Sequence, residues 1–210
     1  MKSLGTFPEP TRVALTFDAE HPDRPGCPPG NADAILNTLR DEAVRATFFV
    51  QGRWAEAAPV TAKRIAEDGH LIGNHSHYHA RMTLLHDDGI AADVGTGQDA
   101  IQRITGADPR PWFRCPFGDG ADDPRVLASL ATLGYRNIDW DIELDDWEPE
   151  RTAAAITGDA IAAVQARRGD AVVLLHAWPA STAGAIGPMI AGLRGSGATF
   201  VTVDELHGED

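Results

Sequence analysis

Residues 12–20, RVALTFDAE, contain the stretch that decides the fold of this 210-residue chain. Residues 12–18 are rich in strand-forming side chains and precede a loop rich in proline and glycine, so they predict a β-strand. Similar short runs recur along the chain and alternate with amphipathic stretches of helical length. This alternation predicts an α/β fold built on a parallel sheet.

Seven strands alternate with six helices in this interpretation. We expect the strands at residues 12–18, 46–50, 70–73, 112–114, 135–139, 171–175 and 199–203. We expect the helices near residues 32–42, 59–67, 88–104, 124–133, 152–167 and 182–194. Either a barrel or an open doubly wound sheet could result, because hydrophobic periodicity does not distinguish the two.

The composition limits the size and the partners of the protein. With 43% apolar residues and no internal repeat or linker, the sequence predicts a single domain over residues 1–210. Asp and Glu outnumber Lys and Arg by 31 to 18, which gives a net charge of −13. This charge argues against nucleic acid and anionic lipid as partners, whereas a neutral sugar or small amide would meet no repulsion. The oligomeric state stays open.

Neither a targeting segment nor a disulfide framework is predicted. The N-terminus lacks the apolar core of a signal peptide, and no apolar run approaches the roughly 18 residues that span a bilayer. The chain as written predicts a cytoplasmic protein without membrane insertion, and a secreted one if a leader has been removed. Cys27 and Cys115 are too few for a disulfide framework.

Candidate site residues fall where strands end. Asp18, His75, Arg114 and His176 each lie at or just after the end of a predicted strand. In parallel α/β folds the ligand site lies at the carboxyl ends of the strands. These side chains therefore predict a functional site at one rim of the sheet.

Three histidines at alternate positions, His75, His77 and His79, lie close together within residues 70–85, HLIGNHSHYHARMTLL. Neutral imidazole is a frequent ligand of zinc and similar metals. Two histidines four residues apart would share one face of a helical turn and could bind one ion. The run therefore predicts a metal site.

Asp18 and Glu20 end the first strand. If the extended conformation continues, residues two apart face the same way and both carboxylates point at one site. One could bind a metal while the other accepts a proton from water. The alternative is a polar strand end that enters a turn. His21, the next residue, is expected to be a loop histidine.

Arg114 and His176 add further candidates. Arg114 precedes a Pro-x-Gly turn, and a buried arginine there would need a carboxylate partner such as Asp18, which it would keep ionised. The backbone N–H groups of the turn could stabilise an oxyanion. His176 follows an apolar strand and could act as a general acid, with a carboxylate to orient it and raise its pKa. Structural roles are the alternative for both residues.

The acidic run at residues 139–147, DWDIELDDW, is open to two interpretations. Its charges are typical of a solvated loop. Its tryptophans, Trp140 and Trp147, could form a sugar platform or belong to the core.

Taken in order, these segments resemble the polysaccharide deacetylases, carbohydrate esterase family 4, which remove acetyl groups from chitin, peptidoglycan and xylan. The resemblance covers residues 12–206. The motif H-[ST]-x-x-H matches residues 75–79, and R-x-P-[FY]-G matches residues 114–118. W-D-x-D-x-x-D-W matches residues 140–147 with Glu143 in place of one Asp, and L-x-H matches residues 174–176.

The resemblance implies a distorted barrel of seven or eight βα units and a role for each matched residue. His75 and His79 would bind one divalent metal, and His77 would be an interior position. Asp18 would be the catalytic base, and Arg114 would hold it.

The same resemblance assigns the acid and the binding pocket. His176 would protonate the leaving group, and Asp146 would tune it. Trp147 and Leu174 would line the acetyl pocket, and the backbone N–H of Phe117 would help form the oxyanion hole.

The first motif departs from the family. The usual T-F-D-D-G has a second Asp that binds the metal, and Ala19 stands at that position. We expect Glu20 to be the third ligand instead, because it faces the same side as Asp18. The alternative is a weaker two-histidine site or no site. Two histidines and a carboxylate suit Zn²⁺, with Co²⁺ or Ni²⁺ as alternatives.

The expected function is a metal-dependent deacetylase that hydrolyses N-acetyl, or less favourably O-acetyl, groups of an acetylated sugar, oligosaccharide or polysaccharide. One alternative is a hydrolase of small linear or cyclic amides on the same scaffold, since divergent relatives include such enzymes. Another is a non-catalytic carbohydrate-binding relative whose first motif has decayed.

Overall fold

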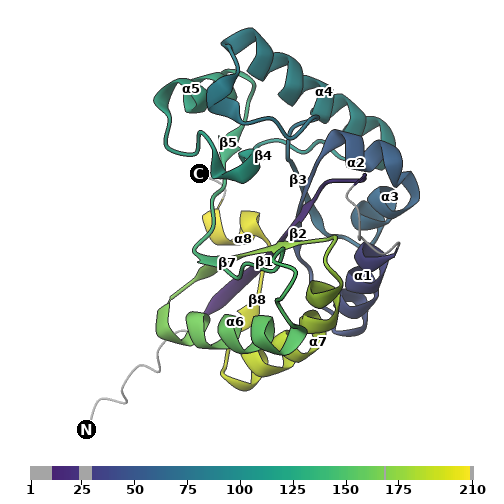
Figure 1. The fold of residues 1–210 in the computed structure, drawn as a ribbon, viewed down its shortest axis with the longest axis vertical. Helices are drawn as coiled ribbons and strands as arrows, with labels where there is room; N and C mark the ends of the chain where they lie inside the picture. Colours follow the sequence, from purple (N-terminus) through teal and green to yellow (C-terminus); the bar gives the residue numbers. More distant parts are fainter. Residues whose placement is uncertain (1–10, 24–29, 168, 209–210) are drawn as a thin grey trace, which may run out of the picture.

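The first predicted strand lies in the middle of the sheet. The computed structural model describes residues 11–23, 30–167 and 169–208. Residues 12–18 belong to β1 (Arg12–Ala19), and its parallel neighbours are β2 (Thr47–Val50), β7 (Ala171–His176) and β8 (Thr199–Phe200) (Figure 1). β7 follows one edge of β1, whereas β8 and β2 share the opposite edge, β8 at its start and β2 at its end.

Four further strands extend this sheet: β3 (Leu71–Asn74), β4 (Trp112–Phe113), β5 (Arg136–Asn137) and β6 (Ile142–Glu143). The order is β5-β4-β3-β2-β1-β7-β6, and every pair is parallel, as predicted. β5 and β6 end this path, and the chain itself bridges them. The Ile138 amide donates to Phe113 of β4 and the Asp141 amide to Val172 of β7. The sheet is curled into a half-barrel, which agrees with the distorted (β/α) barrel expected from the resemblance.

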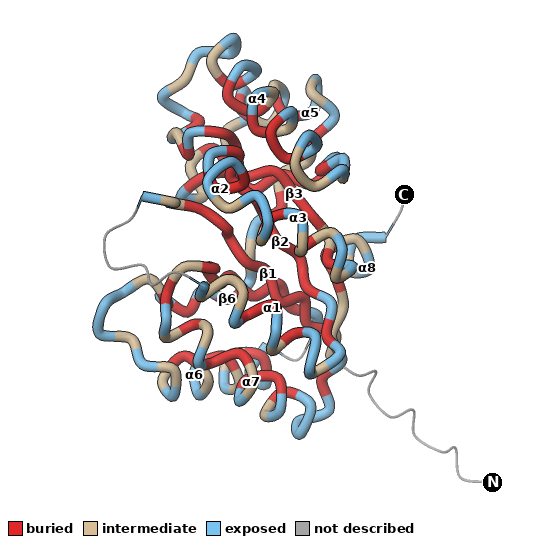
Figure 2. The backbone as a smooth tube through the Cα atoms, turned by 90° about the vertical axis from the view of Figure 1, so that its right-hand side faces the viewer, coloured by how far each residue is buried: buried red, intermediate tan, exposed pale blue. Residues whose placement is uncertain are grey.

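Helices pack around the sheet: α1 (Asn31–Asp41), α2 (Gly52–Ala57), α3 (Pro59–Glu67), α4 (Asp87–Thr105), α5 (Pro124–Thr132), α6 (Ala153–Arg167), α7 (Ala180–Gly195) and α8 (Val203–His207). Helices α1 to α7 form an arc around the strands (Figure 1). Their inward sides are buried and their outward sides exposed (Figure 2). α8 contacts β1, and its Val203 closes the cluster inside the sheet.

Side chains along β1 alternate between two cores. Leu15 and Phe17 pack in the main cluster between sheet and helices. Ala14 faces the smaller cluster inside the curled sheet. Because strand side chains alternate with a period of two, Asp18 and Glu20 face the inside as well.

Three elements differ from the sequence prediction. α2 was not expected, and β6 lies within the acidic run that was expected to be a loop. The strand expected at residues 199–203 ends at Phe200, because Thr202 and Glu205 form a capping box that begins α8. The remaining boundaries agree to within the usual uncertainty of helix and strand ends.

Two further observations concern the cysteines and the membrane. Cys115 is buried as a free thiol, and Cys27 lies outside the described residues. Within the described part of the chain, no helix combines the length and the apolar character that crossing a bilayer requires.

Candidate metal centre and catalytic cavity

Asp18 and Glu20 lie side by side at the end of β1. Both are 4% exposed. Asp18 Oδ2 lies 3.6 Å and Glu20 Oε2 lies 3.2 Å from Nε2 of His75. Ala19, between them, points the other way into the main hydrophobic cluster. The alternation of β1 therefore explains why a carboxylate at Glu20, and not one at position 19, meets the histidines.

His75 and His79 are brought together by a loop, so the helical turn expected here was wrong. Residues 75–80 form no helix. Ser76 and His79 have φ angles of 59° and 60°, which turn the chain back so that the two imidazoles meet. The Ser76 hydroxyl accepts a hydrogen bond from the His79 amide at 2.9 Å. Asp93 of α4 accepts two more from the loop amides between them.

Three ligand atoms converge beside these strands. His75 Nε2 lies 3.1 Å from His79 Nε2 and 3.2 Å from Glu20 Oε2. His79 Nε2 also contacts Glu20 Oε2. Around a tetrahedral zinc ion with bonds of about 2.0–2.1 Å, ligand atoms lie about 3.3 Å apart. Two imidazole lone pairs and a carboxylate oxygen repel one another at such distances unless a proton or a cation lies between them. The donor set therefore fits one divalent ion.

The surroundings select the nitrogen of His75 that faces the cluster and keep Glu20 ionised. The carbonyl oxygen of Arg114 lies 2.9 Å from His75 Nδ1 and can accept a hydrogen bond from its N–H, which leaves Nε2 as the ligand atom. Burial alone would raise the pKa of Glu20, but hydrogen bonds with His21, His75 and His79 outweigh burial and hold that pKa well below its usual value. Glu20 is therefore ionised, as metal ligation requires.

His21 lies in a loop, as expected, but its ring joins the cluster, which the sequence analysis missed. Its Nε2 lies 3.2 Å from Glu20 Oε1, and its ring centroid lies 4.6 Å from that of His79. Ligand atoms of these three residues are close enough to share one ion. The available signal was its place directly after the paired carboxylates. His77, by contrast, is buried outside the cluster, 3.9 Å from Glu56 of α2.

Arg114 is the buried partner of Asp18. It is 1% exposed, and its NH1 donates to Asp18 Oδ1 and to Thr16 Oγ1, both at 2.9 Å. Its Nε donates to the Ile138 carbonyl, and its guanidinium carbon lies 4.1 Å from the ring centre of Phe49. A buried guanidinium needs such complete pairing, and in return it fixes the carboxylate in one orientation.

His176 ends β7 and is held by Asp146. The Nδ1 of His176 lies 2.7 Å from Asp146 Oδ1, and its amide donates to Oδ2 at 2.8 Å. Thr182 of α7 donates to the same Oδ2. Burial alone would lower the pKa of His176, but the hydrogen bond and charge of Asp146, with smaller contributions from Glu20 and Asp18, raise it to about 9. His176 is therefore protonated at neutral pH.

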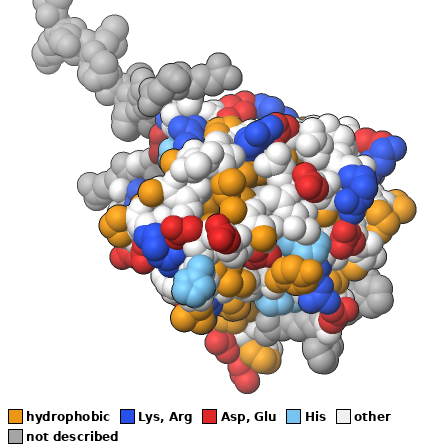
Figure 3. Space-filling model, turned by 90° about the horizontal axis from the view of Figure 1, so that it is seen from above, with side chains coloured by type: hydrophobic (Ala, Val, Ile, Leu, Met, Phe, Trp, Pro, Cys, Tyr) orange, Lys and Arg blue, Asp and Glu red, His pale blue; other side chains and the backbone are white. Residues whose placement is uncertain are grey.

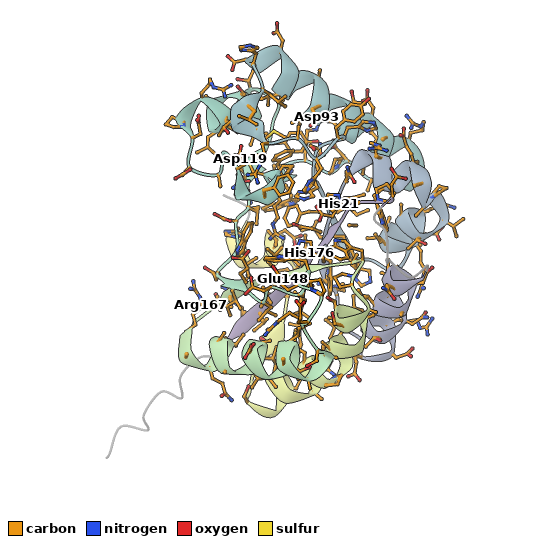
Figure 4. All side chains as sticks on the ribbon, viewed as in Figure 1. His21, Asp93, Asp119, Glu148, Arg167 and His176 are labelled. Carbon is orange, nitrogen blue, oxygen red and sulfur yellow. The ribbon has the colours of Figure 1, made fainter. Side chains whose placement is uncertain are left out.

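One cavity of about 280 Å³ brings most of these side chains together. The predicted site residues that line it are Asp18, Glu20, His75, His79, Phe117, Trp147, Leu174 and His176. Arg114 and Asp146 lie behind this surface, against the residues that they hold. His21 and His176 lie near the centre of the molecule (Figure 4). Seen from above, histidines reach the surface among hydrophobic side chains (Figure 3).

Aromatic side chains shape the cavity. The Trp147 ring meets His176 edge to face with centroids 5.2 Å apart, and Phe117 meets His79 at 4.3 Å. Trp178 also lines the cavity and was missed, although it lies only two residues after His176 on the same strand exit. The acidic run forms part of the wall rather than a fully solvated loop, since Trp140 and Glu143 belong to the lining.

The family model described as Polysaccharide deacetylase matches residues 7–138. The chain belongs to the polysaccharide deacetylase family. This confirms the resemblance inferred from the motifs, and with it the expectation of a hydrolase of polysaccharide-deacetylase type. The match to the family model ends before the motifs at residues 140–147 and 174–176. Relatives that align with nearly the whole chain extend over both motifs.

Two relatives illustrate the similarity. The peptidoglycan-N-acetylmuramic acid deacetylase PdaA of Bacillus subtilis is 30% identical over 203 residues, covering 97% of this chain and 73% of that protein. The peptidoglycan-N-acetylglucosamine deacetylase PgdA of Listeria monocytogenes is 32% identical over 198 residues, covering 94% of this chain and 39% of that protein.

Solved structures show the same fold. A family 4 carbohydrate esterase from Streptomyces lividans, in complex with acetate, has a TM-score of 0.77 and 30% identity, over 90% of this chain and 91% of that one. A family 4 pseudoenzyme from Bacillus anthracis has a TM-score of 0.81 and 27% identity, over 97% of this chain and 67% of that one. Because a pseudoenzyme shares this fold, activity depends on the site residues and not on the fold alone.

Proposed function

We propose that the chain is a metal-dependent deacetylase that hydrolyses the N-acetyl group of an acetylated sugar, oligosaccharide or polysaccharide. One observation carries the proposal. A paired carboxylate, Asp18, and a protonated histidine, His176, face one cavity beside a three-donor cluster that fits a metal.

Glu20, His75 and His79 would hold the ion. Two imidazoles and one carboxylate suit Zn²⁺, and Co²⁺ or Ni²⁺ would also fit. When bound there, a divalent ion supplies Lewis acidity that polarises the acetyl carbonyl and acidifies water.

Asp18 is the candidate general base. Its Oδ1 is occupied by Arg114, whereas Oδ2 is directed toward the cluster, 3.6 Å from His75 Nε2. The buried guanidinium of Arg114 fixes the orientation of this carboxylate, so that its Oδ2 can accept a proton from the attacking water.

His176 is the candidate general acid. Asp146 occupies its Nδ1, which leaves Nε2 as the proton donor toward the cavity. An amine is a poor leaving group until it is protonated, so a histidine that carries its proton at neutral pH suits amide hydrolysis.

Three further residues would bind the acetyl group. Trp147 and Leu174 supply apolar surface in the cavity. The backbone N–H of Phe117 donates to no described acceptor and lies in a turn with a φ of 59°. An N–H in that position would stabilise the oxyanion that forms when water attacks the carbonyl.

The substrate class follows from the relatives and the charge. The relatives named above act on peptidoglycan by name, and an acetylated amino sugar shares that chemistry. A net charge of −13 disfavours polyanions such as nucleic acid. The cavity, about 280 Å³, also has room for a small linear or cyclic amide, so hydrolysis of such amides is the second candidate.

Metal analysis and a substrate panel test the proposal together. Purified protein should contain one divalent ion per chain, and N-acetylated chito-oligomers should be deacetylated faster than O-acetyl esters or cyclic amides. Faster turnover of cyclic amides would favour the second candidate. A protein that stays metal-free after reconstitution and inactive on every substrate would instead be a non-catalytic carbohydrate-binding relative.

A further inference from the structure

The two carboxylate oxygens of Glu20 have different surroundings. Oε2, the inner oxygen, contacts His75 and His79. Oε1, the outer oxygen, faces away from them. It lies 3.2 Å from His21 Nε2, 3.4 Å from the indole nitrogen Nε1 of Trp178, and 3.8 Å from His176 Nε2. The inner oxygen thus contacts the two histidines of the metal site, whereas nitrogen atoms of other side chains surround the outer oxygen.

We propose that His21 is a positioning residue which, together with Trp178, holds the outer oxygen of Glu20 so that the inner oxygen alone binds the metal. The inference rests on the proposed function, in which Glu20 is a metal ligand. It assigns a role to a side chain that the proposed chemistry does not use.

A glutamate needs this support at the end of β1. Its side chain has one more rotatable bond than aspartate, so more of its conformations must be excluded before it can bind an ion. Outer hydrogen-bond donors do this by fixing the orientation of a ligating carboxylate, and their loss typically weakens metal binding about 10- to 100-fold. His21 and Trp178 donate from two different loops, after β1 and after β7 respectively.

Both donors are themselves held in place. The His21 amide donates to Gln51 Oε1 at 3.0 Å, and the Gln51 amide donates to the Ala19 carbonyl at 3.0 Å. Gln51 is 2% exposed. These bonds support a φ of 53° at His21, a conformation that side chains other than glycine adopt only when their surroundings require it. The Trp178 carbonyl accepts a hydrogen bond from Asn31 at 2.6 Å.

The geometry favours positioning over direct ligation by His21. Its Nε2 approaches the outer oxygen, whereas His75 and His79 approach the inner one. An N–H donated to the outer oxygen uses up the lone-pair position that Nε2 would need to bind metal. A glutamine at this position can still donate an N–H but is a poor zinc ligand, so it separates the two roles.

The test compares the zinc affinities of the wild type, His21→Ala and His21→Gln, measured by competition with a chelator. His86→Ala is the control, because His86 is an exposed histidine at the start of α4. We expect about 10- to 100-fold weaker binding in His21→Ala, most of the affinity restored in His21→Gln, and no change in the control. At saturation with Co²⁺, the visible absorption of both His21 variants should match that of the wild type. Thermal unfolding of the metal-free proteins checks that all variants fold.

Three results would overturn the inference. Unchanged affinity in His21→Ala means that the donor does not matter. Loss in both His21 variants with an altered Co²⁺ spectrum makes His21 a direct ligand. If the wild-type protein binds no zinc, the proposed metal-dependent function is itself wrong. This result appears in the first measurement, before any variant is compared.

Discussion

Asp18 of β1 and His176 of β7 are register partners in the parallel ladder between the two strands. Register partners point to the same face of a sheet, and neighbouring strands lie about 4.8 Å apart. The backbone hydrogen bonds of the sheet therefore set the spacing between the candidate base and the candidate acid. Each also has its own buried partner, Arg114 for the carboxylate and Asp146 for the imidazole.

Replacing Asp18 should separate catalysis from metal binding. Asp18→Asn keeps the shape of the side chain but cannot accept a proton, so turnover of N-acetylated chito-oligomers should fall about 10²- to 10⁴-fold. Glu20→Ala is the matched variant two residues away, and it should lose the metal itself. Kinetics and elemental analysis of both proteins check the pair. Full activity in Asp18→Asn would mean that Glu20 is the base and that the two roles are exchanged.

Replacing His176 should affect amides far more than activated esters. An amine must be protonated to leave, whereas a nitrophenolate leaves unaided, so His176→Ala should slow the first reaction strongly and the second only weakly. The measurement is kcat/KM on an N-acetylated sugar and on nitrophenyl acetate, before and after the substitution. Equal losses on both substrates would indicate a binding or structural role for His176.

The sequence predicted those parts of the site that depend on strand ends. Asp18, Arg114 and His176 were expected at one rim because parallel strands bring their carboxyl ends together, and the structure brings them together there. The pairing of Asp18 with Glu20 followed from the two-residue period of a strand. Both predictions need only the local sequence of each strand and the rule that parallel strands bring their carboxyl ends to one edge of the sheet.

The sequence did not predict features that depend on contacts between distant segments. His75 and His79 meet through two positive φ angles, at Ser76 and His79, for which neither residue type gives a signal. Asp93 of α4 supports that loop from outside it. β6 is two residues long and forms by pairing with β7. The acidic residues around it are typical of a loop, so the local sequence gives no sign of this strand.

A pair of glycines in α4 tests how that helix supports the histidine loop. A Cβ atom on Gly97 would lie 2.8 Å from Asn74 Oδ1 and 2.8 Å from the carbonyl of Ser76, whereas one on Gly95 would meet nothing within 4 Å. Gly97→Ala should therefore lower the free energy of unfolding by about 1–3 kcal/mol through overpacking, and it should also weaken metal binding. Gly95→Ala, in the same helix, should raise stability by about 0.5–1 kcal/mol.

Urea unfolding and chelator competition of the two variants provide the comparison. Because both substitutions add one methyl group to α4, their difference isolates the contact with the loop. If both variants were stabilised by a similar amount, the histidine loop would be able to move away from the added methyl group at no loss of stability. Glycine at position 97 would then not be required for the close contact between α4 and the loop.

His70 should make the protein less stable in mild acid. Burial lowers its pKa to about 4, and its Nδ1 accepts a hydrogen bond from the Ala46 amide at 3.2 Å, which requires an unprotonated nitrogen. The unfolded chain binds this proton near pH 6.5 and the folded chain only near pH 4, so the stability contributed by neutral His70 is lost as the pH falls between these values. The slope is about 1.4 kcal/mol per pH unit and the total about 3 kcal/mol. His70→Asn keeps an acceptor for the amide but cannot titrate. Its free energy of unfolding, measured in urea from pH 7 to pH 4, should therefore fall less than that of the wild type, and parallel curves for the two proteins would contradict the assignment.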